Sequence, residues 1–181
     1  MESDISEILL TANDISTRVR ELGKQISEDY NGKELVLLGV LKASFVFLAD
    51  LVKYITIPVT VDFVGISSYR GSTQSTGVIN ITKWLDDNIE NKHVLIVDGI
   101  VDTGRTLVSS GLINRLQADR AASVRICTLL NKPSRRVIEV QLDYLSFSIP
   151  DKFVVGYGLD YKNMYRNLPY IGVLKEEIYR E

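Results

Sequence analysis

The chain has 181 residues, of which 45% are hydrophobic and 24% are charged, enough to bury the core of one compact domain. The formal net charge of -2 excludes the positive field that draws a protein to nucleic acid or to an acidic membrane surface. Cys127 is the only cysteine, which excludes a disulfide framework within one chain. We expect residues 1–181 to form a single domain, cytoplasmic because no apolar run reaches membrane-spanning length.

The first half of the chain alternates predicted helices and strands. Apolar residues recur at helical spacing from Ile15 to Ile26, and Thr11 stands where an N-cap would, which predicts an opening helix. Residues 35–41 are almost wholly apolar, as in a buried parallel strand, and a helix is expected from Phe45. Residues 59–66 predict a second strand. Residues 67–77 are polar and contain glycines, which predicts a long loop.

The second half repeats the alternation. Residues 93–98 predict a buried strand, and apolar residues from Leu107 to Leu116 predict one helix after it. Further strands are expected over residues 124–130, around 144–147 and around 153–156. This order predicts an α/β fold with an open, mostly parallel twisted sheet flanked by helices. Ligands of such sheets bind beyond the carboxyl ends of the strands.

Residues 94–107, VLIVDGIVDTGRTL, form the most informative segment. A buried strand ends near Asp98, and a loop with a second acid, Asp102, follows. Thr103, Gly104 and Thr106 supply hydroxyls and backbone N–H groups ahead of a helix, which is the chemistry of a phosphate cradle.

A second interpretation of the same loop is the P-loop of a nucleotide triphosphatase. Residues 99–106 fit the pattern G-x-x-x-x-G-K-[ST], except that Arg105 replaces the lysine. That lysine reaches the β and γ phosphates, and Asp102 would place a carboxylate within a polyphosphate loop. Both differences weigh against this alternative.

Several segments together resemble the hypoxanthine-guanine phosphoribosyltransferase family, among the type I purine phosphoribosyltransferases. Besides residues 94–107, the resemblance covers residues 41–43 (LKA), 67–69 (SSY), 129–136 (LLNKPSRR), 149–161 (IPDKFVVGYGLDY) and 166–170 (RNLPY), in the family's order. It implies a small hood of terminal segments beside the sheet, a Mg²⁺ cofactor, and a homodimer or homotetramer. The implied reaction is purine salvage, the transfer of a phosphoribosyl group from phosphoribosyl pyrophosphate to a 6-oxopurine.

The resemblance also implies a purine pocket. Asp102 is expected to accept or relay the N7 proton of the base as the catalytic residue, and Lys132 to donate to the 6-oxo group. Phe153 is expected to stack on the base and Val154 to meet its edge. Asp160 is expected to bind the base region and Mg²⁺.

The remaining implied roles concern binding of the phosphoribosyl donor. Asp98 is expected at the ribose and as a second metal ligand. Ser68 and Tyr69 are expected to close over the donor. The 5′-phosphate site is expected at Thr103, Gly104, Arg105 and Thr106, and the pyrophosphate site at Lys42, Ala43 and Arg166. Arg135 and Arg136 are expected to form a solvated face.

The chain departs from the family motif at two positions. Gly99 replaces the second of two adjacent acids, and Ala43 replaces a glycine after the pyrophosphate-loop lysine. The missing carboxylate supports a second hypothesis, that the chain is a catalytically impaired relative that acts as a purine-nucleotide-binding or regulatory protein. It also predicts that Gly99→Asp tightens donor binding by restoring an ionic hydrogen bond.

Overall fold

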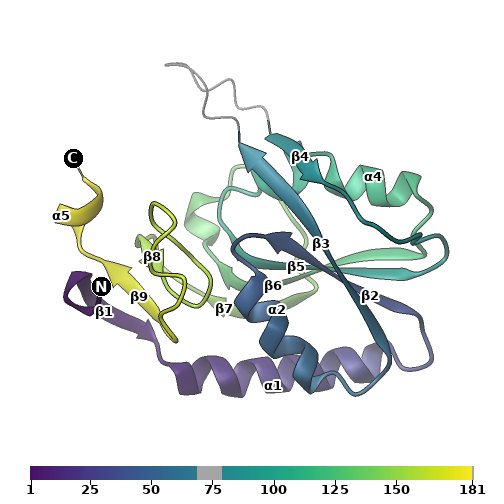
Figure 1. Cartoon of the computed structure of the whole chain (residues 1–181), viewed down its shortest axis with the longest axis horizontal. Coiled ribbons are helices and arrows are strands. Elements are labelled where there is room, and N and C mark those ends of the chain that lie inside the picture. The colour runs from purple at the N-terminus through teal and green to yellow at the C-terminus, as the bar shows by residue number, and fades with distance from the viewer. Residues whose placement is uncertain (69–78, 181) are drawn as a thin grey trace.

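The computed structural model describes residues 1–68 and 79–180, and its centre is a six-stranded sheet (Figure 1). The strand order is β4-β3-β2-β5-β6-β7, and neighbouring strands are parallel except for β3 and β4. These strands are β2 (Leu35–Leu41), β3 (Val59–Ser68), β4 (Ile79–Lys83), β5 (His93–Val101), β6 (Ser123–Asn131) and β7 (Tyr144–Ser148). The expected open, mostly parallel sheet is confirmed.

Helices cover both faces of this sheet. α1 (Ala12–Asp29) and α2 (Phe45–Leu51) pack on one face, while α3 (Arg105–Ser109) and α4 (Leu112–Ala118) pack on the other. Short 3-10 helices span Glu2–Asp4, Val52–Tyr54 and Pro133–Arg135. Thr11 caps α1 as expected: its hydroxyl accepts from the Asp14 backbone N–H, and the Asp14 carboxylate accepts from the Thr11 backbone N–H.

The core is divided by the sheet into two layers because successive side chains of a strand point to opposite faces. Leu35 and Leu37 of β2 belong to the layer under α1 and α2. Val36 and Leu38 belong to the layer under α3 and α4. This double burial explains why residues 35–41 lack an alternating pattern.

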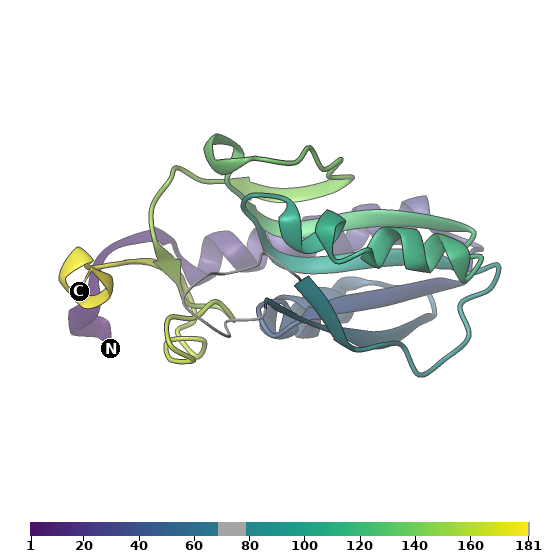
Figure 2. The same cartoon turned by 90° about the horizontal axis from the view of Figure 1, so that it is seen from above.

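The chain termini form a hood beside the sheet. β1 (Ile5–Leu10), β9 (Ile171–Leu174) and β8 (Val154–Val155) make a separate antiparallel sheet, followed by α5 (Glu176–Tyr179). Figure 2 shows both termini at this end of the molecule. The hood was expected from the family resemblance, and the structure confirms it. None of the helices within residues 1–68 and 79–180 is both long and apolar enough to cross a membrane.

Three expected boundaries were wrong. β5 continues past Asp98 to Val101, and β3 extends to Ser68, so residues 67 and 68 belong to a strand rather than to a loop. The single helix expected after β5 is two helices, α3 and α4. Gly111 separates them at φ +72°, a backbone conformation that glycine adopts without the steric cost of a side chain.

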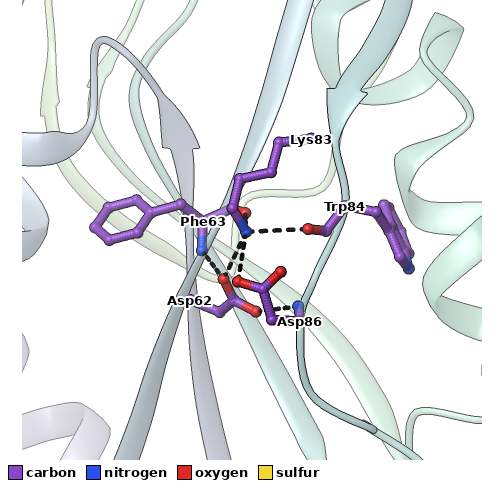
Figure 3. A network of polar contacts seen from close by, with 5 residues as sticks. All are labelled: Asp62, Phe63, Lys83, Trp84 and Asp86. Atoms are coloured by element: carbon purple, nitrogen blue, oxygen red, sulfur yellow. Dashed lines mark hydrogen bonds and ion pairs between the residues drawn. The ribbon is translucent and has the colours of Figure 1, made fainter.

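A set of polar contacts, here called the hairpin-base cluster, joins β3 to β4 and the chain after β4 (Figure 3). The Lys83 ammonium lies 3.1 Å from Asp62 Oδ1 and 3.2 Å from Asp86 Oδ2, and it donates to the carbonyls of Phe63 and Trp84. The second Asp62 oxygen accepts from the Asp86 backbone N–H at 2.9 Å. The cluster therefore holds β3, β4 and the chain after β4 together.

Candidate active site

Two acids expected in the site lie on either side of the end of β5. Asp98 lies within the strand with only 5% of its surface exposed, and burial raises the pKa of its carboxyl to about 7. Backbone N–H groups of Ile100 and Gly99 act in the opposite direction. Asp102 follows the strand and is partly exposed. Near neutral pH, the Asp98 carboxyl can thus be neutral or ionised. A ligand that brings a cation or a hydroxyl donor to it would favour the ionised form.

The loop after Asp102 leads directly into α3. Gly104 is the N-cap of this helix at φ +81°, and Arg105 is its first residue. The Thr103 hydroxyl accepts from the Arg105 backbone N–H at 3.3 Å. Arg105 and Thr106 are exposed. The segment therefore offers solvent-accessible hydroxyl, guanidinium and N–H groups to an anion.

Lys132 contacts the residue before Phe153 at the purine end of the expected site. The Lys132 side chain is 8% exposed, and its ammonium donates to the Lys152 carbonyl at 2.6 Å. Burial lowers the pKa of Lys132, although Asp102 and Asp151 act to raise it. Phe153 is 37% exposed, and Val154, on β8, is buried. A buried cation beside a partly open ring suits a flat base that carries a carbonyl.

Phe153 is supported by two aromatic rings that the sequence reasoning did not single out. The Tyr179 ring of α5 stacks on it with centroids 4.6 Å apart, and the Tyr161 ring meets it edge-on at 5.7 Å. One face of Phe153 is therefore covered by the C-terminal helix. A tyrosine near the C-terminus gives no sequence signal for this contact because the two residues belong to different elements.

Arg135 and Asp151 also belong to this region and were missed. Arg135 Nε lies 3.1 Å from Asp102 Oδ1, and Arg135 Nη1 lies 3.6 Å from Asp151 Oδ1. The expectation of a solvated face was wrong for Arg136, whose Nη1 is buried and whose Nη2 donates to Asn131 Oδ1. Arg135, by contrast, is about half exposed but bound to two acids.

The pyrophosphate loop follows β2. The Leu41–Lys42 peptide bond is cis, Lys42 is exposed, and Ala43 follows it. A β-carbon built on Gly99 would lie 2.8 Å from the Ala43 carbonyl oxygen, and one built on Gly158 would lie 2.4 Å from the same atom. Both glycines thus allow the loop to approach closely.

This packing contradicts the expectation that Gly99→Asp tightens donor binding. The backbone at Gly99 does not require a positive φ, but the space for a side chain is taken by the loop at residue 43. An added side chain must displace that loop. Gly99 is explained by close packing, and the idea of an impaired ribose clamp loses its structural basis.

Arg166 and Asp160 lie beside the same loop. Arg166 Nη1 donates to the Gly158 carbonyl at 2.6 Å, and Nη2 lies 2.7 Å from Asp160 Oδ1. The other Asp160 oxygen accepts from the Asn163 backbone N–H. No group of three or more His, Cys, Asp or Glu side chains within the described ranges is placed to hold a metal ion.

Ser68 is the last residue of β3. Tyr69, its expected partner in closing over the donor, lies outside the described residues.

Comparisons with known proteins agree with this geometry. The family described as "Phosphoribosyl transferase domain" matches residues 6–162. The chain belongs to the phosphoribosyltransferase family. A hypoxanthine-guanine phosphoribosyltransferase of Streptococcus pneumoniae is 50% identical over 179 residues, covering 99% of this chain and 98% of the relative. One from Staphylococcus aureus is 50% identical with 99% coverage of both chains.

Solved structures place this phosphoribosyltransferase in the same branch. A crystal structure of a hypoxanthine phosphoribosyltransferase from Staphylococcus aureus has a TM-score of 0.93 at 49% identity, covering 100% of this chain and 97% of that one. A hypoxanthine-guanine phosphoribosyltransferase from Bacillus anthracis has a TM-score of 0.86 at 39% identity, covering 94% and 98%. The family resemblance is confirmed, and the chain is a transferase of the hypoxanthine-guanine type.

Proposed function

We propose that this enzyme transfers the 5-phosphoribosyl group of phosphoribosyl pyrophosphate to hypoxanthine or guanine, giving IMP or GMP and pyrophosphate. This is a purine salvage reaction, which we place in the cytoplasm. The observation that carries the proposal is that Asp102, after β5, and Lys132, after β6, interact with one another, while the Lys132 ammonium donates to the Lys152 carbonyl next to Phe153. The close similarity to hypoxanthine-guanine phosphoribosyltransferases supports it.

At the purine end, each group has a distinct task. The Lys132 ammonium donates to the 6-oxo oxygen, whose negative charge grows as the ring loses a proton. Asp102 accepts the N7 proton while N9 of the base forms the new bond to C1′ of the ribose. Asp102 Oδ1 is buried and accepts no hydrogen bond within the described part of the chain. The Asp102 side chain is 35% exposed, so the part of the carboxyl group that a base can reach does not include Oδ1.

At the donor end, the same step breaks the bond between C1′ and the pyrophosphate oxygen. Residues 103–106 hold the 5′-phosphate, and Asp98 accepts from a ribose hydroxyl. Lys42, the backbone at Ala43, and Arg166 stabilise the departing pyrophosphate. The contact between Ala43 and Gly158, together with the Arg166 bond to Gly158, supports this grouping.

Magnesium suits the donor end. Mg²⁺ usually keeps several waters and takes one or two protein carboxylates, and Asp160 is partly exposed beside the pyrophosphate residues. When bound, Mg²⁺ neutralises charge on the pyrophosphate. Asp98 is the second candidate ligand, although it is deeply buried.

Neither alternative from the sequence gains support. The P-loop interpretation needs a lysine at Arg105, and the family match assigns the segment to a phosphoribosyltransferase instead. The impaired-relative hypothesis rested on Gly99, which packing against Ala43 explains. The similar proteins carry enzyme names.

A product assay tests the proposal directly. The chain is mixed with phosphoribosyl pyrophosphate and Mg²⁺, and a panel of purine and pyrimidine bases is supplied one at a time. We expect nucleotide from hypoxanthine or guanine and none from pyrimidines. Saturable binding of base without any product would contradict an enzymatic function.

We also propose that the enzyme is a homodimer or homotetramer. A similar protein from Trypanosoma cruzi was studied for its oligomeric state, with 39% identity and a TM-score of 0.88. Light scattering on the purified chain measures its mass in solution, and a monomer at all concentrations would contradict the proposal.

A further inference from the structure

Four charged side chains form a series of alternating sign at the purine end, here called the site cluster: Asp102, Arg135, Asp151 and Lys132. Arg135 Nε lies 3.1 Å from Asp102 Oδ1, Arg135 Nη1 lies 3.6 Å from Asp151 Oδ1, and Lys132 Nζ lies 4.0 Å from the same Asp151 oxygen. Arg135 is therefore the link between the two acids.

The backbone fixes Arg135 relative to Asp102 on both sides. Before it, the Lys132 backbone N–H donates to the Val101 carbonyl at 3.0 Å. After it, the backbone N–H groups of residues 137 and 138 both donate to the Thr103 carbonyl at 3.0 Å. The segment containing Arg135 is thus hydrogen-bonded to the segment containing Asp102 at two points. The short distance between Arg135 and Asp102 therefore follows from this backbone pairing and not from the side chains alone.

The ion pair leaves Asp102 with spare capacity as an acceptor. Oδ1 faces the guanidinium at 3.1 Å, yet the two atoms lack the alignment of a hydrogen bond, and Oδ1 has no other partner within the described residues. A charge at this distance attracts the carboxylate without using its lone pair. The other charged groups facing it are Lys132 and, farther along, Asp151.

We propose that Arg135 is a positioning residue for phosphoribosyl transfer: it holds the buried Asp102 Oδ1, so that the exposed part of the carboxylate faces the base. The proposal rests on the proposed function, which assigns the proton to Asp102. Exposed ion pairs contribute little to folding stability, and Arg135 is 49% exposed. Its contribution is therefore expected in the reaction.

The test compares Arg135→Gln, which removes the charge, with Arg135→Lys, which keeps it. Arg120→Gln is the matched control, because Arg120 is an exposed arginine paired with Glu90 outside the site. For each protein, kcat and the KM values for hypoxanthine and for phosphoribosyl pyrophosphate are measured from acidic to alkaline pH. Thermal unfolding of each variant checks that it is folded.

We expect Arg135→Gln to lower kcat about tenfold, because a proton acceptor that is no longer held in place is poorly oriented toward the base. The KM for hypoxanthine should change less than kcat, because the lost orientation affects proton transfer and not the Lys132 contact with the base. Arg135→Lys should restore most of kcat. The donor KM and the unfolding temperature should stay as in the wild type.

Several outcomes would overturn the proposal. An Arg135→Gln variant with wild-type kcat and pH profile would show that Asp102 does not need the guanidinium. A rise in the KM for phosphoribosyl pyrophosphate as large as the fall in kcat would show that Arg135 acts on this substrate instead. A wild-type chain that makes no nucleotide would overturn the proposed function itself, and this inference with it, whereas wild-type turnover isolates the question of Arg135.

Discussion

The hairpin-base cluster and the site cluster each contain a lysine and two aspartates, but the two lysines differ in how completely they are bound. Lys83 has four oxygen partners at 3.0 to 3.2 Å (Figure 3). Lys132 has one carbonyl at 2.6 Å and one carboxylate at 4.0 Å, although it is more deeply buried. Within residues 1–68 and 79–180, the Lys83 ammonium has a full set of oxygen partners, whereas the Lys132 ammonium has only one at hydrogen-bonding distance.

The pKa values follow this difference. Burial acts to lower the pKa of Lys83, but its bonds to Asp62 and Asp86 outweigh this and raise it. For Lys132, burial dominates over the two nearby acids, and its pKa is lowered. An ammonium with a complete set of oxygens stabilises structure, whereas one with an incomplete set can take an oxygen from a ligand. Substitutions should separate these two roles.

The largest effect is expected from Asp102→Asn in the site cluster. The amide keeps the size of the side chain but cannot accept a proton, so turnover should fall about 10²-fold or more. Donor binding and the unfolding temperature should change little. Steady-state kinetics with both substrates measure this. Unchanged turnover would remove Asp102 from the mechanism.

Next in size is Lys132→Ala. The loss of a charged donor to the 6-oxo group should raise the KM for hypoxanthine roughly 10- to 100-fold, as expected for a hydrogen bond to a charged group. The KM for phosphoribosyl pyrophosphate should stay nearly constant, and Lys132→Met, which retains much of the side-chain volume, should behave like Lys132→Ala. Equal weakening of both substrates would contradict a specific contact with the base.

Asp98 should make the stability of the folded protein depend on pH. Its pKa is raised to about 7 in the folded protein, against about 3.9 in an unfolded chain. Between these two pH values the folded state binds more protons than the unfolded state, so the free energy of unfolding should fall as pH rises. The destabilisation by the buried carboxylate should reach its full size above the folded pKa. In metal-free protein, Asp98→Asn should therefore gain about 1–2 kcal/mol at alkaline pH over the wild type, and little at acidic pH. Denaturant unfolding at both pH values measures it, and a parallel pH dependence in both proteins would contradict the assignment.

The smallest effect is expected in the hairpin-base cluster. Lys83→Met removes a satisfied cation that is 40% exposed, so the unfolding temperature should fall by only about 2–4 °C. The kcat and the hypoxanthine KM should remain within about twofold, since no substrate group is assigned to this lysine. Calorimetry and kinetics on the same preparation compare it with Lys132→Ala. A loss of purine binding in Lys83→Met would break the distinction between the two lysines.

The sequence predicted best the elements whose signal is local. The helical spacing from Ile15 to Ile26 and the capping residue Thr11 predicted α1, and continuous apolar runs predicted β2, β5 and β6. β1 was missed because none of its residues is fully buried and its partner, β9, is far away in the chain. Gly111 was missed as a break because apolar spacing continues on both sides of it.

The candidate site was predicted unevenly for the same reason. The family resemblance supplied Asp102, Lys132 and Phe153, whose roles stay predictions. It did not supply the Arg135 ion pairs, because these depend on backbone pairing between residues 132–138 and the loop after β5. Pairings of this kind are set by tertiary structure, and a linear motif does not contain them.

The close packing of Gly99 and Gly158 around the Ala43 carbonyl limits the order in which substitutions can accumulate at this site. An acid at position 99 has no room while the loop keeps its path through residue 43, so an ancestor or descendant that carries the acid must hold that loop differently. The loop would have to change first, or at the same time, for the acid to be tolerated. Positions 43, 99 and 158 should therefore vary together among relatives, as an epistatic group whose members come from three separate segments of the chain.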